Sequence, residues 1–133
     1  METDVSAEKI ADVVKSAELS QICNPTSGNC VEVAIAINEI FEIDYYYVAL
    51  QPGQKPTRPA HIAVMKNGTI IDASGTVSEG RMRSYATAGL KQDEIERADW
   101  GPADTSLFEN YRRGDGGQQL IDNIIEQIES VML

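Results

Sequence analysis

The strongest local pattern in the sequence is His61-Ile-Ala-Val-Met-Lys66, then Asn67-Gly68, then Thr69-Ile-Ile-Asp-Ala73. Two apolar runs flank an Asn-Gly pair, and both of these residue types tolerate the positive φ angles of a type I′ turn. The pattern predicts an antiparallel hairpin with a two-residue loop. Its register follows by counting along the chain: Lys66 pairs with Thr69, Met65 with Ile70, Val64 with Ile71, Ala63 with Asp72 and His61 with Ser74.

This register brings a histidine and a carboxylate together. Asp72, opposite Ala63, lies on the same face as His61 and is its diagonal neighbour, at roughly 7–8 Å between backbones. A slip of one residue would turn Asp72 to the other face. The hairpin therefore predicts a His61–Asp72 contact. Each residue also has a purely structural interpretation, with His61 as a hydrogen-bonded residue at a strand end and Asp72 as a cap of the turn before Gly75.

The twelve residues from Cys30 to Phe41 are the most apolar part of the chain. Val31, Val33 and Ile35 alternate as in a strand. The length, the two alanines and Glu32 in the first turn favour a buried helix instead. We therefore expect a helix that begins at Cys30, after a Cys23–Asn29 loop rich in Pro, Gly and Asn.

A cysteine at the start of a helix has the properties of a nucleophile. Unpaired backbone amides at that end stabilise a thiolate, and a nearby protonated histidine stabilises it further. His61 would act as the base for Cys30, and Asp72 would orient the imidazole. An oxyanion would need further donors: the Cys30 amide and an upstream side-chain amide, for which Asn24 is the first candidate and Asn29 and Gln21 are weaker ones. The alternative is that Cys30 is simply a small buried residue.

Two segments, GNCVEVAIAINEIF (residues 28–41) and HIAVMKNGTIIDASG (residues 61–75), carry a family resemblance. Together they resemble the core of the papain-like cysteine hydrolases. The second is similar to the histidine hairpin of cell-wall endopeptidases, bacteriocin-leader peptidases and transglutaminase-like proteins. The resemblance covers about residues 21–75. It implies an α+β domain in which a buried helix that begins with the cysteine packs on a small antiparallel sheet, with Cys30, His61 and Asp72 as catalytic residues and Asn24 at the oxyanion hole.

The remaining sequence completes one domain over residues 1–133. Apolar periodicity predicts a first helix over Ser6–Leu19 and a last helix whose stripe is core or a homodimer surface. Tyr45–Leu50 should be a strand and Gln51–Ala60 a loop with three prolines. A strand near Arg97–Trp100 and a short helix over about Asp104–Arg113 are also expected.

Composition narrows the class of partner. The net charge of −10 disfavours nucleic acid, whose phosphates would be repelled. No apolar run is long enough for a membrane span and no signal sequence is recognisable, so a cytoplasmic location is expected. Residues 45–83 carry two acidic and five basic side chains, a local charge of +3. This segment either favours an anionic substrate or is simply a solvated surface.

The sequence thus predicts a cysteine-dependent amide hydrolase that acts on a peptide or protein through an acyl-enzyme, without a metal or organic cofactor. Acyl transfer and deamidation share that intermediate and stay open as alternatives. A non-enzymatic α+β module that binds a protein partner is the other class of function. These classes differ in whether Cys30, His61 and Asp72 converge beside a cleft.

Overall fold

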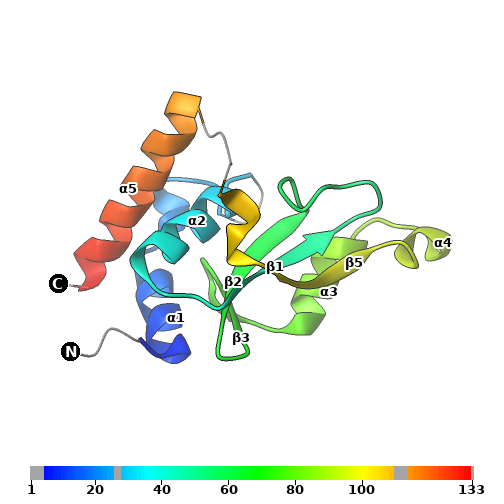
Figure 1. The fold of residues 1–133 in the computed structure, drawn as a ribbon, viewed down its shortest axis with the longest axis horizontal. Coiled ribbons are helices and arrows are strands. Elements are labelled where there is room, and N and C mark those ends of the chain that lie inside the picture. Colours follow the sequence, from blue (N-terminus) through cyan, green and yellow to red (C-terminus); the bar gives the residue numbers. More distant parts are fainter. Residues whose placement is uncertain (1–4, 26–27, 110–113, 133) are drawn as a thin grey trace.

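The computed structural model describes residues 5–25, 28–109 and 114–132. The chain folds into an α+β structure (Figure 1). Its elements follow in this order: α1 (Ala7–Ser16), the 3₁₀ helix η1 (Leu19–Gln21), α2 (Cys30–Ile40), β1 (Tyr45–Leu50), β2 (His61–Lys66), β3 (Thr69–Asp72), β4 (Gly75–Val77), α3 (Glu79–Thr87), α4 (Gln92–Ile95), β5 (Asp99–Ala103), the 3₁₀ helix η2 (Thr105–Phe108) and α5 (Gly114–Met132).

The strands in the described part of the chain form one antiparallel sheet in the order β4-β3-β2-β1-β5. The predicted hairpin is its centre. Lys66 pairs with Thr69, and the next two pairs along the hairpin also match the register expected from the sequence. Asn67 and Gly68 have φ angles of 50° and 80°, as a type I′ turn requires. The hairpin prediction is therefore confirmed.

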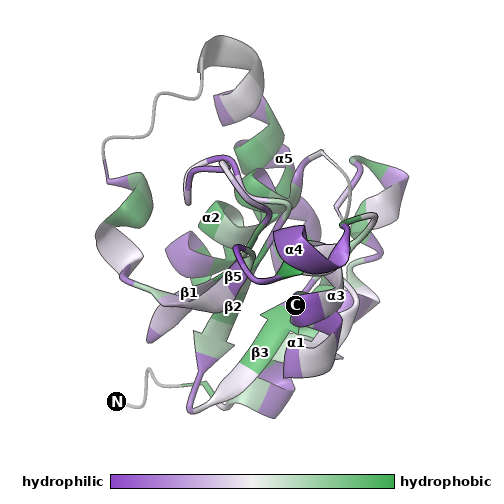
Figure 2. Ribbon diagram, turned by 90° about the vertical axis from the view of Figure 1, so that its right-hand side faces the viewer, coloured by the Kyte–Doolittle hydropathy of each residue, from purple (hydrophilic) through white to green (hydrophobic). Residues whose placement is uncertain are grey.

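Helices cover both faces of the sheet. The helices α1, α2 and α5 share a core with one face, and α5 packs along α2 (Figure 1). The helix α3 packs against β1 and β5 on the other face, over a smaller core that contains Met82 and Ala86. Figure 2 shows β3 as largely hydrophobic and α4 as largely hydrophilic, in keeping with a sheet buried between helices.

The helix expected from Cys30 is confirmed as α2, and its apolar residues on nearly all sides reflect burial between the sheet and α5. The expected first helix is confirmed as α1, where Ser6 caps the N-terminus by accepting a hydrogen bond from the Lys9 amide at 3.2 Å. In α5, Ile121, Ile124 and Ile128 are fully buried in the core. The stripe thus serves as core, and the homodimer through this helix stays a prediction.

Two expectations after Ser78 differ from the structure. The strand expected near Arg97–Trp100 is present but lies slightly further along the chain, at Asp99–Ala103, and it includes Pro102. Proline lacks an amide hydrogen and is tolerated there because β5 is an edge strand. The helix expected over Asp104–Arg113 is only η2 within the described residues, and residues 110–113 lie outside them. The sequence pattern also missed β4, α3 and α4.

In the described residues, we find no helix with both the length and the apolar character needed to cross a membrane.

Candidate active site

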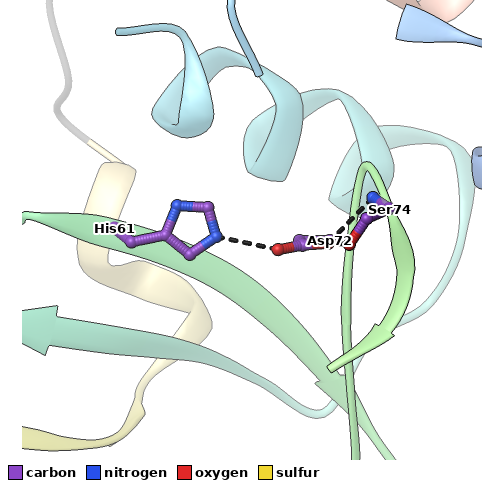
Figure 3. A network of polar contacts seen from close by, with 3 residues as sticks. All are labelled: His61, Asp72 and Ser74. Atoms are coloured by element: carbon purple, nitrogen blue, oxygen red, sulfur yellow. Dashed lines mark hydrogen bonds and ion pairs between the residues drawn. The ribbon is translucent and has the colours of Figure 1, made fainter. Parts of the chain in front are cut away.

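The first part of the site is a buried pair at one end of the central hairpin. His61 opens β2 and Asp72 closes β3, and their side chains are only 0% and 3% exposed. The His61 Nε2 atom lies 2.9 Å from Asp72 Oδ2 (Figure 3). The contact expected from the hairpin register is therefore present in the structure.

Ser74 holds the carboxylate in place. Its backbone amide donates to Asp72 Oδ1 at 2.8 Å, and its hydroxyl donates to the same oxygen. Both bonds use the oxygen that does not face His61, so the two carboxylate oxygens have separate roles (Figure 3). An Asp whose side chain accepts from the amide two residues later is a common turn motif, and Asp72-Ala-Ser74 carries its signature.

The second ring nitrogen of His61, Nδ1, is buried and has no hydrogen-bond partner of standard geometry in the described structure. In Figure 3 it points to the side where the cyan helix α2 runs. Cys30 is 7% exposed and lies at the start of α2. Its thiol interacts with the imidazole closely enough to raise the pKa of His61. Sulfur and imidazole are therefore neighbours that do not form an aligned hydrogen bond.

The electrostatics of this arrangement favour a protonated histidine. Burial by itself lowers the pKa of His61, but the hydrogen bond that its Nε2 donates to Asp72, the interactions with Cys30 and the charges of both groups raise this pKa to about 8. For Asp72, burial raises the pKa of the carboxyl group. The hydrogen bonds with His61 and Ser74 more than offset the effect of burial, so that the pKa of Asp72 is lowered. An imidazolium held by a carboxylate on one side stabilises a thiolate on the other.

Two residues of α3, which no sequence pattern pointed to, complete the surroundings of His61. The Tyr85 ring stacks on His61, with centroids 4.1 Å apart and planes inclined by 23°. Arg81 interacts with Tyr85 and with the charge of Asp72, and the pKa of Arg81 is raised as a result. Stacking by Tyr85 restricts rotation of the imidazole about the axis set by Asp72.

Two cavities lie near the site. One, of about 320 Å³, is lined by Cys30 together with Gly28, Val31, Glu32, Thr57, Arg58, Pro59 and Ala60. The other, of about 630 Å³, has Asn24, Cys23, Ala73 and Ser74 among its lining residues. Cys30 therefore borders open space, as an attack by its sulfur on a substrate would require.

Asn24 is not brought to the cavity that contains Cys30. It is exposed, and it lines the larger cavity beside Ser74. The weaker oxyanion candidates have their side-chain donors engaged: Asn29 Nδ2 donates to Glu32 at 3.3 Å, and Gln21 Nε2 donates to Glu18 at 3.0 Å. The oxyanion role of Asn24 stays a prediction. The first amides of α2, which have no partners within the helix, lie beside Cys30.

The environment of the second cysteine, Cys23, is that of a residue with a structural role. Cys23 Sγ donates to the Leu19 carbonyl at 3.3 Å, and burial followed by the charge of Glu32 raises the pKa of the Cys23 thiol. Both cysteines are free thiols. Among the described residues, no group of three or more His, Cys, Asp or Glu side chains is placed to hold a metal ion.

The charge state of His61 gives a direct prediction. We expect its NMR titration midpoint near pH 8, above the unfolded value of 6.5, because Asp72 and Cys30 stabilise the imidazolium. The resulting stability, about 2 kcal/mol for a shift of this size, is fully present below pH 6.5 and is lost as pH rises through about 8. The chain has one histidine, so its signal is unambiguous. Cys30→Ala should lower the midpoint, and a wild-type midpoint at or below 6.5 would contradict the assignment.

Comparison of the chain with protein-family models, with curated proteins and with solved structures found no match.

Proposed function

We propose that the protein is a cysteine-dependent amide hydrolase with a papain-like arrangement, in which Cys30 is the nucleophile, His61 the base and acid, and Asp72 the group that orients His61. One observation carries the proposal: the buried His61 ring, bonded through Nε2 to Asp72, has an unbonded Nδ1 and an interaction with the Cys30 thiol. A histidine with a purely structural role would be expected to satisfy both nitrogens.

The chemistry follows from the positions of these groups. The Cys30 thiolate would attack an amide carbonyl, and the first amides of α2 would stabilise the oxyanion. His61 would donate its Nδ1 proton to the leaving nitrogen as the C–N bond breaks. Nδ1 would then accept a proton from water, whose oxygen attacks the thioester; the C–S bond breaks, the acid is released, and the Cys30 thiolate and the His61 imidazolium are restored.

Several other features support the proposal. A buried helix that begins with the cysteine packs on an antiparallel sheet whose histidine and aspartate strands are adjacent. The substrate would be a peptide or protein, entering along the cavities that border Cys30 and Ser74. A cytoplasmic location belongs to the same proposal, since reducing surroundings keep cysteines as free thiols.

The proposal has a test that needs no substrate. We expect the rate at which iodoacetamide alkylates Cys30 to change less than about twofold between pH 6 and 8, because His61, whose pKa is raised to about 8, keeps its positive charge beside the sulfur over most of this range. Cys23, whose pKa is raised by burial, provides the internal comparison and should react faster by close to tenfold per pH unit. Peptide mass spectrometry separates the two sites.

The control is His61→Ala, which should make the Cys30 profile as steep as that of an ordinary thiol. A wild-type Cys30 profile that already rises about tenfold per pH unit would remove the mechanism and leave a protein-binding module as the better interpretation.

A further inference from the structure

The cavity beside Cys30 has a positively charged side chain in its wall. Arg58 is exposed and lines the same 320 Å³ space as the nucleophile. Within the described residues, the Arg58 guanidinium makes none of the ion pairs or side-chain hydrogen bonds found in the structure. A guanidinium without a partner at the edge of a reactive site can bind a carboxylate in two-point geometry.

The backbone holds Arg58 in this position. Its amide donates to the Lys55 carbonyl at 2.8 Å, and the Ala60 amide donates to Ala49 of β1 at 2.9 Å. The bond between Ala60 and Ala49 fixes the end of the loop directly before His61, so that the same hydrogen bond positions both the loop and the proposed catalytic histidine. Arg58 therefore has a defined place relative to the site.

One acidic residue, Glu32, also lines this cavity. Its carboxylate accepts from Asn29 Nδ2 at 3.3 Å, and its charge acts on Cys23, whose pKa it helps to raise. Glu32 thus has a hydrogen-bond partner at the start of its own helix, whereas Arg58 belongs to the loop between β1 and β2. The local segment of residues 45–83 carries +3 in a chain of −10, so this region has the one positive balance of the sequence.

We infer that Arg58 binds a carboxylate of the substrate in this cavity, so that an acidic residue next to the cleaved amide is preferred. This inference rests on the proposed hydrolase function and names the substrate class of the same site. The general acidity of the chain repels anions at long range, and Arg58 provides the local attraction that such a substrate needs.

The test uses two alkylating agents that differ only in charge: iodoacetate carries a carboxylate, as glutamate does, and iodoacetamide carries a neutral amide, as glutamine does. Iodoacetate and iodoacetamide each transfer a substituted methyl group to the Cys30 sulfur, with iodide as the leaving group. The ratio of their rates cancels the ionised fraction of the thiol and reports the local charge. Cys23→Ser gives a background with one cysteine, and serine retains a donor for the Leu19 carbonyl.

We expect Arg58→Gln to lower the iodoacetate-to-iodoacetamide ratio about fivefold at low salt, as one charge within several ångströms would do near a protein surface. Added salt should lower the wild-type ratio in the same direction. Arg97→Gln removes an exposed charge that lines none of the cavities near the site, and it should leave the ratio unchanged. The inference is overturned if Arg58→Gln does not lower the iodoacetate-to-iodoacetamide ratio. It is also overturned if Glu32→Gln raises this ratio by more than Arg58→Gln lowers it.

Peptide cleavage separates this inference from the proposed function. Matched peptides with Glu or Gln beside the cleaved bond should show a preference for Glu that Arg58→Gln removes. Equal cleavage of both peptides by the wild type overturns the inference and leaves the mechanism intact. Absence of Cys30-dependent cleavage of either peptide overturns the proposed function itself.

Discussion

Cys30→Ala should abolish the proposed hydrolysis, with a loss of at least about 10⁴-fold in kcat/KM, because it removes the sulfur atom that would form the acyl-enzyme. The measurement is the appearance of new peptide termini in a mixed peptide library, followed by mass spectrometry. Alanine fits the buried start of α2 without adding volume, so the fold should persist.

Cys23→Ser is the matched control for this prediction. It changes the other cysteine, which is half-buried and bonded to the Leu19 carbonyl, and a hydroxyl can make the same bond. Activity within about twofold of the wild type is expected, since surface and half-buried substitutions of this kind have small effects. Equal cleavage by Cys30→Ala and the wild type would eliminate Cys30 as nucleophile.

Asp72→Asn should reduce kcat/KM by about 10²–10⁴-fold while the fold stays intact, in line with the loss of an orienting carboxylate in other triads. Asp72 Oδ1 is held by Ser74, so an asparagine that keeps its oxygen there turns its NH₂ group toward His61 Nε2. Nε2 must then accept, and the proton moves to Nδ1, the atom that should serve as base for Cys30. The variant therefore carries the wrong tautomer.

A second readout separates orientation from mere stability. The His61 midpoint should fall below about 8 in Asp72→Asn, because the hydrogen bond and charge of Asp72 help to raise it. Asp44→Asn is the control, since Asp44 accepts from the Asn67 amide at 2.7 Å on the same hairpin but away from the site. Activity loss of similar size in both variants would show that hairpin integrity, not the tautomer, is being measured.

Local sequence predicted much of this site because its two central residues, His61 and Asp72, lie close together in the sequence. Asn67-Gly68 fixes the turn, the turn fixes the register, and the register fixes the meeting of His61 with Asp72. The start of α2 at Cys30 followed from a breaker-rich loop before an apolar run. The His61–Asp72 pair is eleven positions apart, and the loop and the apolar run that predict α2 are adjacent in the sequence.

The remaining features depend on distant parts of the chain. Tyr85 reaches His61 only because α3 packs on the far face of the sheet through Met82 and Ala86, two buried residues in an otherwise polar helix. That pattern is too sparse to predict a helix by periodicity. Gly101 and Pro102 have a low intrinsic preference for strands. Pairing of β5 with β1 outweighs this preference. The place of Asn24 depends on the path of a loop, which no pattern specifies.

The hairpin also has a consequence for the order of folding. His61 and Asp72 are joined by a tight turn and can meet on the microsecond scale on which β-hairpins form. Cys30 is separated from His61 by α2, β1 and a long loop, so its approach involves a contact of high sequence separation, which forms more slowly. We therefore expect the imidazole–carboxylate pair to form before the thiol arrives. An incompletely folded chain, for example during synthesis, would then carry an ordinary thiol, and its reactivity would appear only when the helix docks.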